Sequence, residues 1–432
     1  MIERDNYRPR LIDPKIENNM KVFGAVNLIG AKACGKTSSG EYHTKQKVCI
    51  ASSDGEYASR TIAQINPSLV LKDTQRPCLI DEWQELPQIW DAVRFECDAQ
   101  QQAGQFILTG SSATSGMIHS GAGRIVDIRM LTMSIYEMGM SAPKTVSLKS
   151  MFDREGKIEP LFTGDISLND IISFVGQGGW PKLVVLKDQD LSAAGQTIAS
   201  GYLNAVIERD VKKVSGFKRT PKKEALSGLL KAIAVNDART TTYQEYIESA
   251  KNLSGAKISV NTVPLYLEIF EKLYLIEDQV AFSSPAQTSR VLLTSPKHRF
   301  VDPSLIIAAL EREPEHLIRD IPTLETAFDN LCVHDLKVYA ESLDGKVYHY
   351  KDSYGTTADS VVRLKDGRWC AFDHVLGPHQ IDAAADKLCK LKKAYSETCD
   401  PASFMGVICA TVNAVYTRPD GIVVLPVHAL TP

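Results

Sequence analysis

The sequence predicts an α/β protein with a parallel-sheet core in its first 140 residues, then a helical segment and a second, smaller α/β unit. The first observation is that short apolar runs alternate with helical patterns up to about residue 140. Strands that alternate with helices are typical of a parallel sheet. The second observation is that the middle of the chain keeps only helical spacing, whereas the last hundred residues return to strand-like runs.

Five apolar runs in the first part have the length of buried strands. They cover residues 22–29, 47–51, 78–80, 105–108 and 125–131. Between the third and fourth runs, apolar residues recur at the three- and four-residue spacing of a helix. These are Leu86, Ile89, Trp90, Val93 and Cys97.

The middle of the chain predicts three short helices followed by a β-rich stretch at 275–293. The apolar helix positions are Leu226, Leu229, Leu230 and Ile233, then Tyr243, Tyr246, Ile247 and Ala250, then Val263, Tyr266, Leu267, Phe270 and Leu273. Three helices and a hairpin are the pattern of a winged helix. Its third helix would expose the residues Asn261, Thr262, Glu268, Glu271 and Lys272, flanked by Lys251, Lys257 and Arg290. Two glutamates on that face would repel phosphates, which weakens the case for DNA binding.

The last part of the chain predicts a separate small α/β unit. Its expected strands are 346–350, 358–364, 368–376, 404–412 and 421–427, and its expected helix is 380–395. Asp-Gly pairs at 344–345 and 366–367 supply the turns between the first strands.

Length and composition limit the class of protein. Single hydrophobic cores stop growing at roughly 250–300 residues, so 432 residues require more than one domain. A net charge of −3 excludes a strongly basic nucleic-acid-binding chain as a whole. The nine cysteines are odd in number and contain no C-x-x-C pair, which argues against a zinc ribbon or a disulfide scaffold. With no apolar signal segment and no run of about 20 apolar residues, we expect a cytoplasmic protein.

A phosphate-binding loop follows the first predicted strand. The segment reads Gly30, Ala31, Lys32, Ala33, Cys34, Gly35, Lys36, Thr37 and Ser38, which fits G-x-x-x-x-G-K-[ST]. Gly30 and Gly35 allow a tight turn whose N–H groups bind phosphate oxygens. Lys36 is expected to reach the β- and γ-phosphates, and the Thr37 hydroxyl to bind Mg²⁺. The alternative is a glycine-rich turn with a surface lysine.

Two carboxylates end the third predicted strand. Asp81 is expected to hold Mg²⁺, and Glu82 to polarise the attacking water. Adjacent strand residues face opposite sides, but the end of the strand lets the second side chain turn inward. An Asp-Glu pair alone is common in proteins. Its position after a phosphate loop favours the interpretation as a catalytic pair.

Two further elements are candidates for the same site. Thr109 and Ser111 follow the fourth strand and are expected to sense the γ-phosphate, unless they form an ordinary strand exit. Arg124 follows a glycine-rich stretch and could stabilise the transition state, with Arg129 as a second candidate and a surface loop as the alternative. Such an arginine is worth about 10³–10⁵ in rate.

The chain resembles a family of prokaryotic AAA+ ATPases with a C-terminal region of unknown function. The matching segments are LIGAKACGKTS, CLIDEWQELPQIWDAVRFECD, QFILTGSS and SGAGRIVDIRMLTMSIYEMG, then GQGGWPKL, ISVNTVPLYLEIFEKLYLIEDQVAF and SPKHRFVDPSLIIAAL. The resemblance implies an AAA+ core at 1–140, a helical lid or linker at 141–220, a winged-helix segment at 221–300 and a restriction-endonuclease-like domain at 301–432. It also implies that the phosphate loop, Asp81 and Glu82 match the family's motif positions, with ATP and Mg²⁺ as the ligands of the site.

The C-terminal domain departs from the nuclease pattern of Asp followed by Glu-x-Lys. Asp359 fits the first position and Asp373 can replace the glutamate. Val375 stands where a lysine would stabilise charge on the attacked phosphate, which a valine cannot do. His374 is no substitute, because it faces the other side of the strand. We therefore expect a domain that does not cut DNA.

Three functions remain open from the sequence. The leading one is a Mg²⁺-dependent ATPase that acts as a nucleotide-driven switch. The second is a nucleotide-dependent regulator with little turnover, which binds DNA or a protein through the winged-helix and C-terminal regions. The third is a nuclease licensed by ATP. ATP is favoured over GTP because no Asn-Lys-x-Asp motif occurs, and an oligomer is possible.

Overall fold

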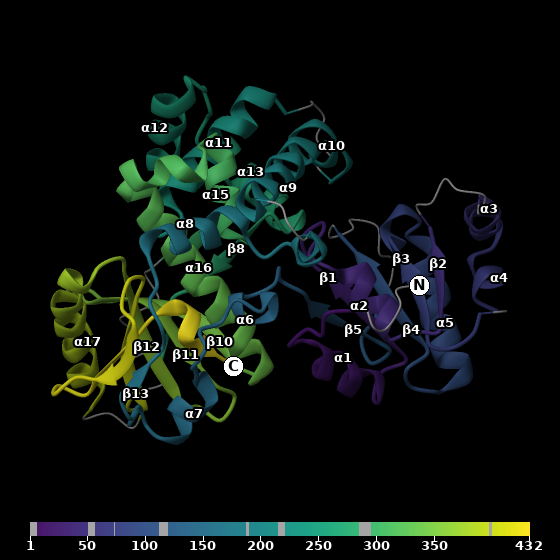
Figure 1. Ribbon diagram of the computed structural model, residues 1–432. Coiled ribbons are helices and arrows are strands. Elements are labelled where there is room, and N and C mark those ends of the chain that lie inside the picture. Colours follow the sequence, from purple (N-terminus) through teal and green to yellow (C-terminus); the bar gives the residue numbers. More distant parts are fainter. Residues whose placement is uncertain are drawn as a thin grey trace. The chain divides into compact units, whose positions relative to one another are not determined.

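The computed structural model describes residues 7–50, 57–72, 74–111, 120–186, 190–214, 221–284, 295–396 and 400–432. The chain forms two compact units. Unit 1 comprises Met1–Thr132, Asp210–Lys218 and Ile269–Leu275, and unit 2 comprises Met133–Arg209, Arg219–Glu268 and Ile276–Pro432. Each unit is described by itself below (Figure 1).

Unit 1 is built on a five-stranded sheet with the order β2-β3-β4-β1-β5, in which all neighbours are parallel (Figure 1). Its strands are β1 (Ala25–Ile29), β2 (Gln46–Cys49), β3 (Cys78–Asp81), β4 (Phe106–Gly110) and β5 (Ile125–Arg129). Each predicted apolar run overlaps one of these strands, so the predicted parallel sheet is confirmed. The carboxyl ends of β1, β3 and β4 therefore meet at one edge.

Besides the short helix α10 (Val211–Val214), unit 1 contains five α-helices in the described part of its N-terminal segment. They are α1 (Asp13–Met20), α2 (Lys36–Tyr42), α3 (Tyr57–Ile65), α4 (Pro67–Lys72) and α5 (Gln88–Gln100). The helix expected from apolar spacing is α5. Its residues Ile89, Trp90 and Val93 are buried and join a core with Phe106 and Leu108 of β4. The three- and four-residue spacing puts these side chains on one face, and that face packs on the sheet.

Unit 2 begins with a helical region. Its main helices are α8 (Leu168–Gln177), α9 (Leu191–Ala205), α11 (Lys223–Asn236), α12 (Tyr243–Ser254), α13 (Thr262–Lys272), α15 (Pro303–Ala309) and α16 (Ile321–Ser342), and the last residues of α13 count with unit 1. The predicted apolar positions of α11 and α13 are all buried. Tyr243 is helical as predicted, but its side chain is 42% exposed. It is the first residue of α12, directly after the Thr242 cap, before the helix reaches the core.

An antiparallel pair of strands follows α13. It joins β8 (Ile276–Gln279) to β9 (Lys297–Phe300), with Ile276 opposite Phe300. The second part of the expected β-rich stretch, residues 285–293 with Arg290, lies outside the described residues.

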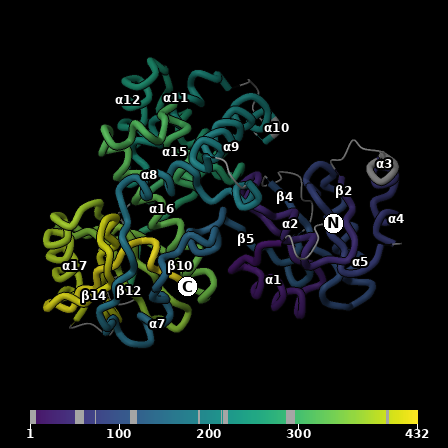
Figure 2. The backbone as a smooth tube through the Cα atoms, viewed as in Figure 1, coloured from purple at the N-terminus to yellow at the C-terminus, as the bar shows by residue number. Residues whose placement is uncertain are grey.

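The C-terminal part of unit 2 forms a mixed seven-stranded sheet with the order β10-β11-β12-β13-β15-β14-β7. Its strands are β10 (Lys346–Lys351), β11 (Thr357–Arg363), β12 (Trp369–Val375), β13 (Phe404–Cys409), β14 (Ala414–Thr417), β15 (Ile422–Leu425) and β7 (Leu161–Phe162). All five predicted strands are present, and the predicted helix is α17 (Ile381–Ser396). A further pair joins β6 (Val146–Ser147) to β16 (Leu430–Thr431). The smooth trace in Figure 2 follows the yellow strands beside α17.

Helix α17 covers one face of this sheet. Trp369 and Ala371 of β12 share a core with Ala385 and Leu388 of α17. Intervening residues of β12 point the other way, because side chains alternate along a strand. The cysteines of the described residues are all free, and most of them are buried. In the same part of the chain, no helix combines the length and apolar character needed to cross a bilayer.

Candidate nucleotide-binding site

The loop between β1 and α2 has the backbone of a phosphate cradle. Gly30 has a φ of 149° and Gly35 a φ of 104°, in the region that favours glycine. A Cβ added to Gly30 would lie 2.2 Å from the carbonyl oxygen of Met130. Both glycines are thus required by this path of the chain. Successive N–H groups along such a loop form a concavity that suits phosphate oxygens.

The Lys36 side chain is folded back over this loop. Its ammonium donates to the carbonyl oxygen of Gly30 at 2.9 Å and to that of Ala31 at 2.7 Å. Lys36 is only 5% exposed. A buried cation held by two neutral carbonyls is well placed to take up phosphate oxygens, because ionised acceptors give stronger hydrogen bonds.

Asp81 lies at the centre of a hydrogen-bond network at the carboxyl edge of the sheet. Its Oδ1 accepts from the Thr37 hydroxyl at 2.9 Å and from the Thr109 hydroxyl at 2.5 Å. These residues come from α2, β3 and β4, so the structure brings together the Mg²⁺ and sensor candidates of the sequence. Hydroxyl and carboxylate oxygens are the ligands that Mg²⁺ prefers. The residues therefore fit a Mg²⁺ ion.

Glu82 leaves the strand by a left-handed turn. Its φ is 56°, and its N–H donates to the Thr109 hydroxyl at 3.2 Å. Its carboxylate accepts from Ser111 Oγ at 3.2 Å and from the side-chain amide of Gln84. A non-glycine residue in this region is strained, and such strain gathers at functional sites. The turn frees Glu82 from strand alternation, as the sequence reasoning required.

Lys47 was not foreseen from the sequence. It lies on β2, and its ammonium is 3.1 Å from Asp81 Oδ2 and 2.9 Å from Glu41 Oε1. Burial alone would lower the pKa of Lys47, but the Glu41 hydrogen bond and the charge of Asp81 raise it above the ordinary value. A lysine thus adds permanent positive charge beside Asp81. The only signal in the sequence was a charged residue inside an apolar strand.

Two long-range contacts fix the outside of the loop. The Arg10 guanidinium donates to the carbonyl oxygens of Cys34 at 3.0 Å and Leu131 at 2.9 Å. Lys32 forms an ion pair with Asp210, with its Nζ 2.5 Å from Oδ2. These partners are distant in sequence, so no local pattern points to them.

Comparison with known proteins agrees with this geometry. Residues 23–139 match the model of the AAA domain. This part of the chain is an AAA domain with a P-loop. Residues 169–316 match a domain of unknown function, DUF8612. No curated protein matches the chain.

Among solved structures, the chain is similar to the Walker-type ATPase PABY2304 of Pyrococcus abyssi. The two share 13% sequence identity, with a TM-score of 0.45. The similarity covers 71% of this chain and 97% of the archaeal one.

The AAA domain separates its two candidate arginines. Arg129 ends β5 opposite Ile29, at the edge that carries the P-loop. Arg124 precedes the first residue of β5 and lies roughly 17 Å from Arg129 along the strand direction. It is 46% exposed at its side chain and pairs with Asp98 at 2.7 Å. The structure does not bring Arg124 to the phosphate loop of its own chain.

Replacing Arg124 by alanine is therefore expected to leave ATP turnover of the isolated chain unchanged. Loss of a transition-state arginine would instead cost about 10³–10⁵ in rate. Phosphate release measured over a range of protein concentrations checks this. A large loss that appears only at high concentration would place Arg124 in the site of a second copy.

The C-terminal candidates lie together in unit 2. The backbone N–H of Asp359 donates to Asp373 Oδ1 at 3.3 Å. The backbone N–H of His374 donates to Asp359 Oδ2 at 3.0 Å. A lysine approaches from α17, with Lys387 Nζ 2.6 Å from Asp373 Oδ2. Burial, followed by the charge of Asp359, raises the pKa of Asp373 to about 7. Helix α17 thus supplies, through Lys387, the ammonium group that the nuclease pattern expects at the position of Val375.

A pH test follows from His349 of β10, which is fully buried. Burial, with help from Lys297 and Arg299, lowers its pKa to about 3. Below about pH 6.5 the unfolded chain binds a proton that the folded chain does not. The free energy of unfolding therefore decreases as the pH is lowered below about 6.5. At pH 5 this costs about 2 kcal/mol relative to pH 7.5.

We expect His349→Phe to lose that part of the acid sensitivity. The measurement is the free energy of urea unfolding at pH 7.5 and pH 5. His316, whose side chain is 69% exposed, provides the control variant His316→Phe, which should keep the wild-type pH dependence. Equal acid sensitivity in all three proteins would contradict a neutral His349.

Proposed function

We propose that the AAA domain binds ATP with Mg²⁺ and hydrolyses it slowly, as a nucleotide-driven switch. The observation that carries this is the single network of Thr37, Asp81, Glu82 and Thr109 beside the Lys36 loop. Binding alone needs only the loop. A carboxylate held one residue beyond the Mg²⁺ candidate adds the group that a hydrolytic step requires.

Each residue then has a chemical role. Lys36 neutralises the β- and γ-phosphates, and Thr37 and Asp81 hold the cation. Bound Mg²⁺ supplies charge for the developing negative phosphate oxygens. Glu82 orients and deprotonates the attacking water, and Thr109 links Glu82 to Asp81. Ser111 holds the Glu82 carboxylate in place, so both sensor candidates act through hydrogen bonds to the two acids.

The proposal is tested first at the level of binding. Lys36→Met is expected to weaken ATP affinity by roughly 10- to 150-fold, since a hydrogen bond to a charged group is worth about 1.5–3 kcal/mol. Calorimetric titration of ATP with Mg²⁺ measures this. The matched control is Lys45→Met, which removes an exposed lysine from the same domain. Equal affinity in all three proteins would remove the phosphate-site assignment.

A second candidate is a nucleotide sensor with little turnover. The placement of Arg124 at the far end of β5 favours it, because Arg124 does not reach the loop of its own chain. For both candidate functions, we propose that α11 to α13 with β8 and β9 form a winged-helix-like segment that binds a partner. We also propose domain boundaries at residues 140, 220 and 300. Exposed Glu268 on α13 favours a protein partner over DNA.

A further inference from the structure

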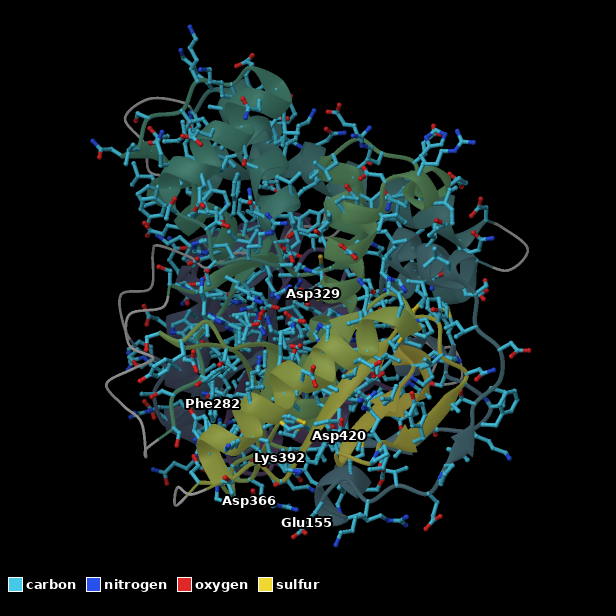
Figure 3. All side chains as sticks on the ribbon, turned by 90° about the vertical axis from the view of Figure 1, so that its left-hand side faces the viewer. Glu155, Phe282, Asp329, Asp366, Lys392 and Asp420 are labelled. Atoms are coloured by element: carbon cyan, nitrogen blue, oxygen red, sulfur yellow. The ribbon has the colours of Figure 1, made fainter. Side chains whose placement is uncertain are left out.

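Helix α16 brings a third acid to the polar cluster of unit 2. Asp329, labelled in Figure 3, projects from α16, and its Oδ1 is 2.7 Å from Nδ1 of His374. One ligand atom each from Asp329, Asp359 and His374 lies within 4.8 Å of the others. Ligands about 2 Å from one metal ion lie roughly 3–4 Å apart, so small rotations bring these three onto a common centre.

The surroundings of His374 are compatible with a metal-binding tautomer. Its Nε2 lies 3.3 Å from the Ser360 hydroxyl, which can accept its proton. With the proton on Nε2, Nδ1 turns a lone pair toward a carboxylate oxygen of Asp329. In this tautomer, a cation bound by both atoms satisfies the two acceptors. Metal-bound histidines usually donate their other N–H in this way.

A buried lysine is the second, independent observation. Lys297 of β9 is 8% exposed, and in the described ranges its ammonium forms no hydrogen bond or ion pair. Burial and then Arg299 lower its pKa, while the charges of Asp329 and Asp359 oppose this, so it lies near the carboxylates. Three protein ligands leave an open coordination position, and this ammonium can hold water or an anion there.

We propose that Asp329, Asp359 and His374 form a second metal site, specific for a divalent transition-metal cation and separate from the nucleotide site. One imidazole with two carboxylates suits Mn²⁺ or Zn²⁺ better than Mg²⁺, which prefers oxygen ligands alone. The ion crosslinks α16 to the ends of β11 and β12. The proposal is independent of ATP hydrolysis, because it uses residues of unit 2 only.

The test is a Mn²⁺ titration of the full chain without nucleotide, with free Mn²⁺ measured by electron paramagnetic resonance. The wild type is expected to bind one Mn²⁺ that Asp359→Asn and His374→Asn do not bind. Ser360→Ala should weaken binding about 10- to 100-fold, as loss of a partner behind a ligand does. Asp81→Asn, in the nucleotide site, should bind Mn²⁺ like the wild type.

Asp329 is left unchanged in these variants because it pairs with buried Arg299 at 2.6 Å. Tryptophan fluorescence establishes that each variant is folded. If His374→Asn does not fold, Mn²⁺ binding by Asp359→Asn and Ser360→Ala tests the proposal. Absence of Mn²⁺ binding by the wild type overturns the proposal and leaves His374 donating its Nδ1–H to Asp329. Binding kept by Asp359→Asn, or lost in Asp81→Asn, overturns it equally.

Discussion

Replacing Glu82 by glutamine is expected to lower ATP turnover by about 10²–10⁴ and to leave ATP affinity unchanged. The amide keeps the shape of the side chain and can still bond to Ser111, but it cannot take a proton from water. Lys36, Thr37 and Asp81 are untouched, so phosphate and cation binding persist. Phosphate release and calorimetric titration on the same protein separate the two effects.

The matched control is Glu85→Gln, which removes a carboxylate three residues further along the same turn. It should turn over ATP like the wild type. Equal, near-background rates in wild type and Glu82→Gln would remove the ATPase proposal and leave the nucleotide sensor. A loss of ATP affinity in Glu82→Gln would instead show that Glu82 supports the loop rather than the water.

Local sequence predicted the AAA core well because its central strands β1, β3 and β4 are buried on both faces. Such strands are continuous apolar runs, and the phosphate loop has a fixed spacing that follows one of them. Only the ends shifted: Val22 was expected in a strand but is 73% exposed, and β1 begins at Ala25. The closeness of Asp81 and Thr109 follows from the strand order, since β4 lies between β1 and β3.

The rest of the site depends on contacts that no local pattern encodes. Lys47 reaches Asp81 across β2 and β3, and Arg10 reaches the loop from the N-terminal segment. The glycine-rich stretch before Arg124 suggested a catalytic arginine, but this pattern does not include the direction of β5. In a parallel sheet the start of every strand lies opposite the edge that carries the P-loop, so strand direction alone separates Arg124 from the phosphates.

The C-terminal unit shows the same limit. Its five strands were visible as apolar runs, but β14 and the two-residue strand β7 were not, because their pairing joins residues about 250 positions apart. The nuclease motif considers only residues of the strand that carries Val375, and this strand has no lysine at that position. Lys387 arrives from α17 and Lys297 from β9. Side chains from distant elements can fill a position that a strand motif leaves without its usual residue.

Replacing Arg299 by leucine is expected to cost about 3–5 kcal/mol in the unfolding free energy of unit 2, because it leaves buried charges without a partner. Arg299 is 1% exposed. Its Nη1 lies 2.6 Å from Asp329 Oδ2 and 3.2 Å from Asp237 Oδ1, and its Nε donates to Gln279 at 2.6 Å. Urea unfolding followed by tryptophan fluorescence measures the loss.

The pH dependence of this variant identifies the cause. Burial already raises the pKa of Asp237 to about 6 against the opposing charge of Arg299, and removal of that charge raises it further. A carboxyl whose folded pKa is raised adds stability at low pH, and this is lost as pH rises through the folded value. The deficit of Arg299→Leu should therefore be smaller at pH 5 than at pH 8. Arg312→Leu, at an exposed arginine, should change stability by no more than about 0.5 kcal/mol at either pH. A deficit of Arg299→Leu that is equal at both values would indicate lost packing rather than uncompensated charge.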